Sequence, residues 1–325
     1  MTHRLFYAYA RHALVAALRM ARVTTGSTVL LPHFICRDVL ASIAAVGATP
    51  MFYDIDDDLQ VSQNTMLPAA TALLAVNYFG FPADLARLHR QQSDPATIII
   101  EDNAHGWLSA DEHGVPLGTR TALGITSFRK TIRSIDGAYL DWNSSQLSSE
   151  ITSPSALAPR TESLPLSYRV RTLVSAIDQR LSVPLMGMAR TNVRRLRRLT
   201  GAASIDERTQ EEWHLPEHEA VHQSSLERFE RTDLVAEVVR RRNTFETCHM
   251  LAQRFNIQTP TSRLPPHVSP QGFPFFAGSG ETDAFRAAIT ESKLGEVVGW
   301  PSLPSATVLD VSSKLRTIQL VNFLR

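Results

Sequence analysis

The stretch that decides the fold of this 325-residue chain is TIIIEDNAHG, residues 97–106. A β-branched apolar run leads directly into two carboxylates, which is typical of a strand buried on both faces. Similar apolar runs occur at residues 26–32, 50–55, 71–76, 122–128 and 137–140. Segments with helical spacing of apolar residues lie between them, at residues 11–22, 36–46 and 82–91. We therefore predict an α/β fold with a mostly parallel sheet sandwiched by helices.

A change of composition divides the chain near its middle. Residues 141–165 are rich in Ser, Thr and Pro, which favours a linker or surface loop. After it, residues 226–255 form a long amphipathic stretch, and residues 272–276 and 281–294 resemble a strand and a helix. We predict a large α/β domain at 1–165, followed at 166–325 by a helical connection and a small α+β domain.

Composition excludes several functional classes. The 33 basic residues nearly balance the 32 acidic ones, so no charge excess suggests a nucleic-acid partner. Cys36 and Cys248 lie far apart and form neither a disulfide framework nor a zinc signature, and we predict no metal site. No apolar run approaches the ~18 residues of a membrane span, and no signal peptide is recognisable. We expect a cytoplasmic protein with no membrane partner.

Reactive side chains follow three of the predicted strands, at residues 77–80 (NYFG), 101–106 (EDNAHG) and 127–130 (SFRK). Asp102 and His105 follow one strand, and Ser127 and Lys130 follow another. Only three of the 33 basic residues are lysines, and the others are arginines. In a chain that uses arginine for most of its cations, each lysine is a better candidate than usual for a position that needs an amine. Read alone, Asp102 could be a helix cap and Lys130 a solvated cation. Because parallel strands end at one sheet edge, however, a carboxylate, an imidazole, a hydroxyl and an amine would meet there.

Pyridoxal 5′-phosphate (PLP) is the cofactor that needs this set of groups. It requires an amine for a Schiff base, a carboxylate that keeps its ring nitrogen protonated, and donors for its phosphate. Lys130 can supply the amine and Asp102 the carboxylate, while His105 can stack on the ring. Ser127 and the start of the helix near Arg11 can hold the phosphate, because free helix N–H groups attract anions.

The order of several segments resembles the DegT/DnrJ/EryC1/StrS aminotransferase family, as a divergent member with an SxRK segment. The matching segments in order are GSTVLLPHFIC (26–36), GATPMFYDID (47–56), AVNYFGFPADL (75–85), IIIEDNAHG (98–106), SFRKTIRSIDGAYL (127–140), RRRNTF (240–245), QGFPFF (271–276) and GWPSLP (299–304). The resemblance implies the PLP-dependent transferase fold of type I, with a seven-stranded sheet.

The resemblance also assigns roles to individual residues. It implies that Asp102 pairs with the pyridine nitrogen, His105 contacts the ring face, Ser127 binds phosphate and Lys130 forms the internal aldimine. The family's phosphate loop before the first helix corresponds to Ala10-Arg11-His12, and the aromatic ring-stacking position of the first strand–helix loop corresponds to Cys36. The commoner family pattern places its lysine at the position of Ile132. Lys130 therefore marks this chain as a variant.

The resemblance implies an aminotransferase. The expected reaction moves an amino group from an amino acid, glutamate in the first instance, to a keto-sugar or similar keto acceptor in polysaccharide or secondary-metabolite biosynthesis. The partners would be the small-molecule amino donor and keto acceptor, and the enzyme would be a homodimer with its site at the subunit interface. Two alternatives remain open: a PLP enzyme of different chemistry, and a non-catalytic or regulatory protein with this fold.

Overall fold

The computed structural model describes most of the chain. The described residues are 2–63, 65–147, 154–164, 168, 213–278, 280–300, 302–305, 307 and 311–324. The chain divides into two compact units, one formed by residues 1–159 and 211–325 and the other by residues 160–210. Much of the predicted helical connection, residues 169–212, lies outside the described residues. The domain boundary expected at residue 165 stays a prediction, and the first unit is described below.

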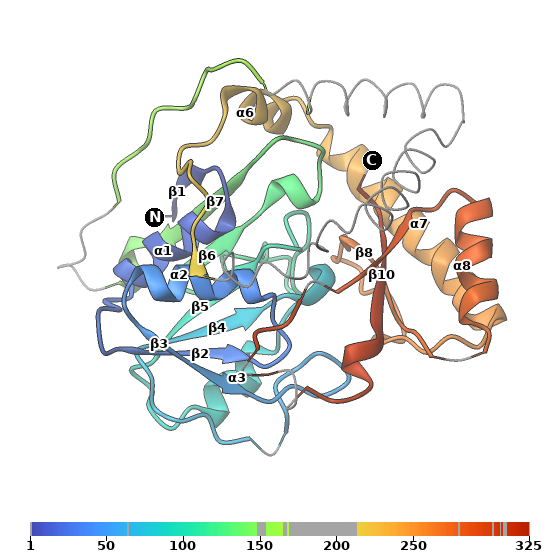
Figure 1. Cartoon of the computed structure of the whole chain (residues 1–325), viewed down its shortest axis with the longest axis horizontal. Helices are drawn as coiled ribbons and strands as arrows, with labels where there is room; N and C mark the ends of the chain where they lie inside the picture. The colour runs from blue at the N-terminus through green and yellow to red at the C-terminus, as the bar shows by residue number, and fades with distance from the viewer. Residues whose placement is uncertain are drawn as a thin grey trace, which may run out of the picture. The chain divides into compact units, whose positions relative to one another are not determined.

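A seven-stranded sheet forms the centre of this unit (Figure 1). Its strand order is β1-β7-β6-β5-β4-β2-β3. The strands are β1 (Thr2–Tyr7), β2 (Thr28–Pro32), β3 (Thr49–Tyr53), β4 (Ala72–Val76), β5 (Ile98–Asn103), β6 (Leu123–Thr126) and β7 (Ala138–Asn143). All neighbours pair in parallel except β7, which runs antiparallel to both β6 and β1. The prediction of a mostly parallel seven-stranded sheet is confirmed.

The sheet is covered on both faces because its central strands are apolar on both. Along β4, Leu73 and Ala75 pack in a cluster with Leu88 of α3 (Leu85–Gln91). The alternate residues of β4, Ala72 and Leu74, join the core cluster that contains α1 (Ala10–Met20). Successive side chains of a strand point to opposite faces, so a continuous apolar run needs helices on each side.

The helix predicted over residues 36–46 is shorter than expected. It consists of the 3-10 turn η1 (Arg37–Val39) followed by α2 (Leu40–Ala45). Cys36 keeps an extended backbone as the N-cap of η1, and Gly47, at φ +71°, ends the element. This places the Cys36 side chain beside the strand ends rather than on a helix surface.

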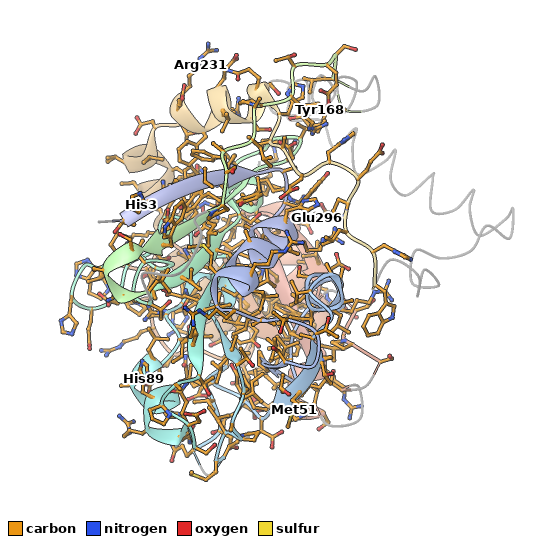
Figure 2. All side chains as sticks on the ribbon, turned by 90° about the vertical axis from the view of Figure 1, so that its left-hand side faces the viewer. His3, Met51, His89, Tyr168, Arg231 and Glu296 are labelled. Atoms are coloured by element: carbon orange, nitrogen blue, oxygen red, sulfur yellow. The ribbon has the colours of Figure 1, made fainter. Side chains whose placement is uncertain are left out.

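Strand β1 was not among the predicted elements. It is an edge strand, and its pairing with β7 is supported by Arg4, whose guanidinium contacts both Asp141 oxygens at 2.7 and 2.8 Å. His3, labelled in Figure 2, stacks on Trp142 of β7 with ring centroids 5.1 Å apart. These cross-strand contacts stabilise a segment that has no strong strand pattern of its own.

The C-terminal part of the unit combines helices with a small antiparallel sheet of order β8-β10-β9 (Figure 1). Its elements are α6 (Gln223–Glu230), α7 (Leu234–Arg254), β8 (Gly272–Phe276), α8 (Thr282–Glu291), β9 (Glu296–Gly299) and β10 (Ile318–Asn322). None of the helices in the described ranges combines the length and apolar character needed to cross a membrane.

One buried arginine joins this part to the large sheet. Arg241 of α7 has no exposed surface, and its Nε donates to Glu237 at 2.6 Å. Its Nη1 donates to the carbonyls of Pro270 and Gln271, and its Nη2 donates to that of Thr131 at 2.6 Å. Thr131 directly follows the 3-10 turn η3 (Phe128–Lys130), so Arg241 fixes the end of the segment that carries Lys130.

Candidate active site

A cavity of about 760 Å³, counted to its open mouth, lies at the carboxyl ends of β4, β5 and β6. This is where an open parallel sheet places its ligands. Six of the seven predicted site residues line it: Arg11, Cys36, Asp102, His105, Ser127 and Lys130. The side chain of His12 does not; its Nε2 donates to the carbonyl of Pro216 at 3.0 Å instead. The reactive side chains that follow the strands therefore meet in one cavity, as expected, and His12 is the exception.

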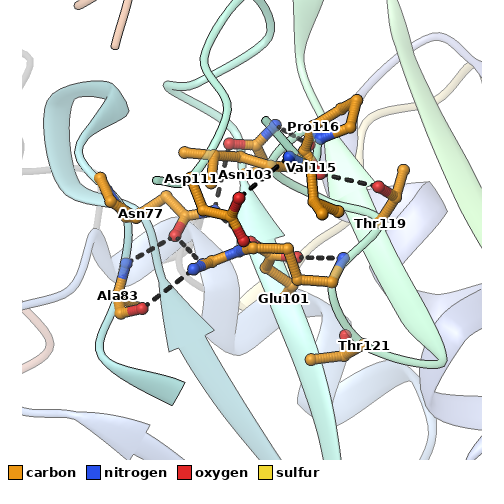
Figure 3. A network of polar contacts seen from close by, with 12 residues as sticks. Asn77, Ala83, Glu101, Asn103, Asp111, Val115, Pro116, Thr119 and Thr121 are labelled. Atoms are coloured by element: carbon orange, nitrogen blue, oxygen red, sulfur yellow. Dashed lines mark hydrogen bonds and ion pairs between the residues drawn. The ribbon is translucent and has the colours of Figure 1, made fainter. Parts of the chain in front are cut away.

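The two adjacent carboxylates of β5 have different surroundings. Glu101 is fully buried and contacts Arg120 at 2.6 Å. It also accepts a hydrogen bond from Asn77 Nδ2 at 2.8 Å, in a network that includes Asn103 (Figure 3). Asp102, one residue later, points to the opposite face of the sheet and lines the cavity. Glu101 thus forms an ion pair with Arg120 inside the fold, whereas Asp102 faces the cavity.

Asp102 is held in place by its own backbone turn. Its Oδ1 accepts a hydrogen bond from the Ala104 N–H at 3.0 Å. Burial raises the pKa of the Asp102 carboxyl above its usual value, while the Ala104 N–H and the charge of Lys130 act in the opposite direction. A buried carboxylate of raised basicity can hold a proton between itself and a ring nitrogen.

Lys130 and His105 are in direct contact inside the cavity. Lys130 Nζ lies 3.0 Å from His105 Nε2, and the Phe79 N–H donates to His105 Nδ1 at 3.3 Å. Because Nδ1 accepts, the neutral imidazole carries its proton on Nε2 and donates it to the lysine nitrogen. Burial lowers the pKa of Lys130, and burial together with the Lys130 charge lowers the pKa of His105 well below its usual value. The lowered pKa of Lys130 favours the neutral amine, which is the nucleophilic form of lysine.

Donors for an anion are among the residues that line the cavity. Ser127 is 1% exposed, and its Oγ has no hydrogen-bond partner among the described residues. Helix α1 begins after the N-cap Tyr9, its first residues line the same cavity as Ser127, and the His12 N–H bonds back to the Tyr9 carbonyl. Within the described ranges, the Ala10 and Arg11 N–H groups have no acceptor. A buried hydroxyl without a partner next to free helix N–H groups matches the requirements of a phosphate.

Several cavity residues were missed in the sequence. Tyr9, Asp38, Tyr78, Arg129 and Trp300 also line the space. Trp300 comes from the segment after β9 and stacks on Phe34, with ring centroids 4.4 Å apart, which places this C-terminal segment at the mouth of a site built on the N-terminal sheet. No local sequence pattern links residue 300 to the strand ends. Arg129 had a visible signal, since it directly precedes Lys130.

Cys36 also belongs to the cavity wall. Burial raises the pKa of its thiol, with the Asp38 charge acting in the same direction. The thiol is therefore neutral at physiological pH, and it presents a small, weakly polar surface toward Lys130.

The N-terminal part of the chain is similar to a known protein family. Residues 2–156 match the model of the DegT/DnrJ/EryC1/StrS aminotransferase family. The match covers a little under half of the chain. The match includes every strand of the seven-stranded sheet and each of the seven residues predicted for the site.

Two curated relatives are named as aminotransferases. UDP-N-acetyl-3-dehydro-alpha-D-glucosamine 3-aminotransferase of Acidithiobacillus ferrooxidans is 29% identical over 121 residues, 36% of this chain and 32% of that protein. L-glutamine:2-deoxy-scyllo-inosose aminotransferase of Streptomyces kanamyceticus is 30% identical over 126 residues, 37% of this chain and 29% of that protein. The matched segments thus span about a third of these relatives' lengths.

The likeness of fold extends further than the likeness of sequence. The structure of a putative sugar aminotransferase from Streptococcus pneumoniae, in its PMP form, aligns with 98% of this chain and 82% of its own at 15% identity, with a TM-score of 0.59. The predicted fold, that of the PLP-dependent transferases of type I, is confirmed.

Proposed function

We propose that this protein is a PLP-dependent aminotransferase. The observation that carries the proposal is the half-buried contact of Lys130 Nζ with His105 Nε2 in the cavity that Asp102 also lines. The DegT/DnrJ/EryC1/StrS aminotransferases are PLP-dependent, and residues 2–156 match the model of that family. The unpartnered Ser127 Oγ, next to the start of α1, provides the complementary site for the cofactor's phosphate.

Lys130, His105 and Asp102 would each have a separate role in transamination. When bound, PLP supplies an aldehyde that condenses with amines and a cationic ring that withdraws electrons from the attached carbon. Lys130, whose pKa is lowered by burial, would attack as the amine and later move a proton between carbon atoms. His105 would hold Lys130 Nζ through its Nε2–H and cover the ring. Asp102 would hold the proton on the ring nitrogen.

The surroundings of the cavity support a small polar keto acceptor. Arg11 and Asp38 form a charged pair at its wall with a closest distance of 3.8 Å, next to the aromatic side chains of Tyr78 and Trp300. Charged and aromatic groups together suit a sugar or cyclitol ring, which has polar edges and apolar faces. We propose a keto-sugar or related cyclic ketone as acceptor, and glutamate or glutamine as donor. We further propose a homodimer that works in the cytoplasm.

An absorption spectrum tests cofactor, amine and half-reaction together. Protein incubated with PLP is expected to show a band near 400–430 nm that sodium borohydride removes, and glutamate or glutamine should convert the band to a shorter wavelength. Lys130→Ala should not form the covalent adduct that borohydride reduction otherwise leaves between the cofactor and the protein. Lys314→Ala is the matched control, because Lys314 pairs with Asp57 at 3.3 Å outside the cavity.

The outcomes separate the alternatives. Protein that takes up no PLP would refute the proposal. Bound PLP that no amino acid converts would instead favour a PLP enzyme of different chemistry, or a non-catalytic protein with this fold. Sedimentation or light scattering at micromolar concentration would measure the oligomeric state, and a monomer would contradict the proposed homodimer.

A further inference from the structure

The segment after β4 holds a phenylalanine in a backbone conformation that residues with side chains rarely adopt. Phe79, in the 3-10 turn η2 (Tyr78–Gly80), has φ +56° and ψ +12°, in the left-handed region. A Cβ is strained there, and a bulky residue is a genuine outlier. Such a conformation persists only where the surroundings hold it, and it is found most often at functional sites. Phe79 is 1% exposed, so its neighbours can be identified.

Both polar groups of the Phe79 backbone are used, and they face different parts of the fold. Its N–H donates to His105 Nδ1 at 3.3 Å, and its carbonyl accepts from the Gln271 N–H at 2.8 Å. His105 follows β5, whereas Gln271 directly precedes β8. Because φ and ψ of one residue set the angle between its N–H and its carbonyl, a right-handed Phe79 would lose one of these bonds. The left-handed conformation therefore brings the N–H to the imidazole while the contact with residue 271 is kept.

Aromatic contacts hold the His105 ring in the same place. The Phe79 ring stacks on the imidazole, with centroids 5.9 Å apart and an angle of 16° between the planes. The Trp300 indole meets the imidazole at 5.8 Å and 88°, and it meets the Phe79 ring at 5.3 Å and 76°. His105 is thus oriented by one hydrogen bond and by two neighbouring rings. This explains why a residue with a ring, and not glycine, occupies the left-handed position.

We propose that Phe79 is a positioning residue that sets the basicity of Lys130 through His105. The Phe79 N–H occupies Nδ1, so the neutral imidazole keeps its proton on Nε2, which lies 3.0 Å from Lys130 Nζ. A hydrogen bond donated to the amine nitrogen favours the neutral amine, whereas the other tautomer would accept from the ammonium and stabilise it. Because Lys130 is the reacting amine only in the proposed aminotransferase, the role of Phe79 rests on that function.

Other groups also act on Lys130, and they must stay constant in a test. Burial is the main cause that lowers the pKa of Lys130. The other side chains that act on this pKa are Cys36, Asp102, Arg129 and Asp38. Lys130 in turn acts on the pKa of His105, which burial lowers most. A substitution of any of these side chains would change the charges around Lys130 as well as the tautomer. The change is therefore made in the uncharged backbone of residue 79.

Replacing one backbone amide by an ester removes a single N–H and leaves the side chain. In the full apo chain, Phe79 is replaced by its α-hydroxy analogue, phenyllactate. The same replacement of Phe81 is the matched control, because the Phe81 N–H donates to the Tyr78 carbonyl at 2.9 Å and not to an imidazole. An ester at 79 also weakens the Tyr78 carbonyl as an acceptor, and the control loses that same bond. Histidines labelled with ¹⁵N report by NMR which ring nitrogen is protonated, and His105→Gln identifies the signals of residue 105.

The two esters are expected to differ at His105. The unmodified chain and the Phe81 ester should keep the proton on Nε2. The Phe79 ester should shift the tautomer ratio about 5- to 10-fold toward Nδ1, because one hydrogen bond is lost. The pKa of Lys130 should then rise, since Nε2 accepts from the ammonium. Trace acetylation at several pH values, read by mass spectrometry, measures this pKa, with Lys314 outside the cavity as the internal reference.

Three results would overturn the role of Phe79. They are an unchanged tautomer in the Phe79 ester, the same change in both esters, and a changed tautomer with an unchanged titration of Lys130. Phe79→Asn separates the N–H from the ring, because Asn adopts the left-handed conformation more readily and keeps the N–H. This variant should keep the proton on Nε2, and its loss there would assign the tautomer to ring stacking and overturn the role of the N–H.

Failure of this role is distinguishable from failure of the proposed function. The tautomer and the titration are measured on apo protein, so any of the overturning results leaves the aminotransferase proposal standing. If the unmodified chain and the esters behave as expected but the unmodified chain takes up no PLP, the proposed function is overturned and the coupling of Phe79 to Lys130 remains.

Discussion

Replacing Glu101 by Gln is expected to lower the free energy of unfolding by about 3–5 kcal/mol, because it leaves the Arg120 guanidinium charged and buried without its carboxylate. Glu101 has no exposed surface, and the Arg120 side chain is only 9% exposed. The Gln amide can still accept one hydrogen bond from Arg120 but does not neutralise its charge. Urea unfolding followed by tryptophan fluorescence measures the loss.

Asp102→Asn is the matched variant, one residue further along β5. It should change the free energy of unfolding by less than about 1 kcal/mol, or raise it, because Asn can still accept from the Ala104 N–H. The pKa of Asp102 is raised by burial, so its contribution to stability is present below the unfolded pKa of about 3.9 and is lost as pH rises through the folded pKa. The advantage of Asn over Asp should therefore be larger at pH 7 than at pH 4.

The ranking of the two variants reverses for cofactor chemistry. Asp102→Asn should abolish the half-reaction with an amino acid, since an amide cannot keep the ring nitrogen protonated, while Glu101→Gln protein that remains folded should retain it. Equal stability losses in the two variants, or a loss below about 1 kcal/mol for Glu101→Gln, would refute the separation of the two carboxylates by the faces of β5.

Three further substitutions test the support of the site. Arg241→Met should cost about 3 kcal/mol in urea unfolding, because it leaves several buried carbonyls, including that of Thr131, without a donor; an unchanged midpoint would contradict its role in holding η3. Gly137→Ala should cost more than Gly114→Ala, since both have positive φ but only at Gly137 would the new Cβ meet the Phe128 ring, at 2.2 Å; equal midpoints would argue against this close contact. Ser127→Ala should leave apo stability unchanged, since its Oγ has no partner in the described ranges, yet weaken PLP about tenfold in an absorbance titration; a destabilised apo protein would show instead that the hydroxyl serves the fold.

The predictable part of the fold came from patterns that local physics imposes. Continuous apolar runs such as residues 71–76 and 97–100 predicted buried parallel strands, because a strand covered on both faces has no solvated side to carry polar residues. The edge strand β1 escaped prediction because its stability comes from Arg4 and His3 pairing with β7, more than a hundred positions away in the chain. Its local sequence contains no comparable signal.

The same division applies to the site. Asp102, His105, Ser127 and Lys130 could be found because each follows a strand, and parallel strands deliver their ends to one edge of the sheet. Alternation along β5 separates Glu101 from Asp102, but which of them meets Arg120 depends on where the loop after β5 returns. The direction of the His12 side chain and the arrival of Trp300 depend equally on distant segments.

The amino-acid order alone thus determined the class of fold, the edge at which reactive groups collect, and the amine available there, since these follow from side-chain periodicity and strand direction. Packing between distant segments decided which carboxylate faces the cavity and which histidine contacts the lysine. Those properties depend on burial and on the distances between atoms, and neither exists until the chain has folded.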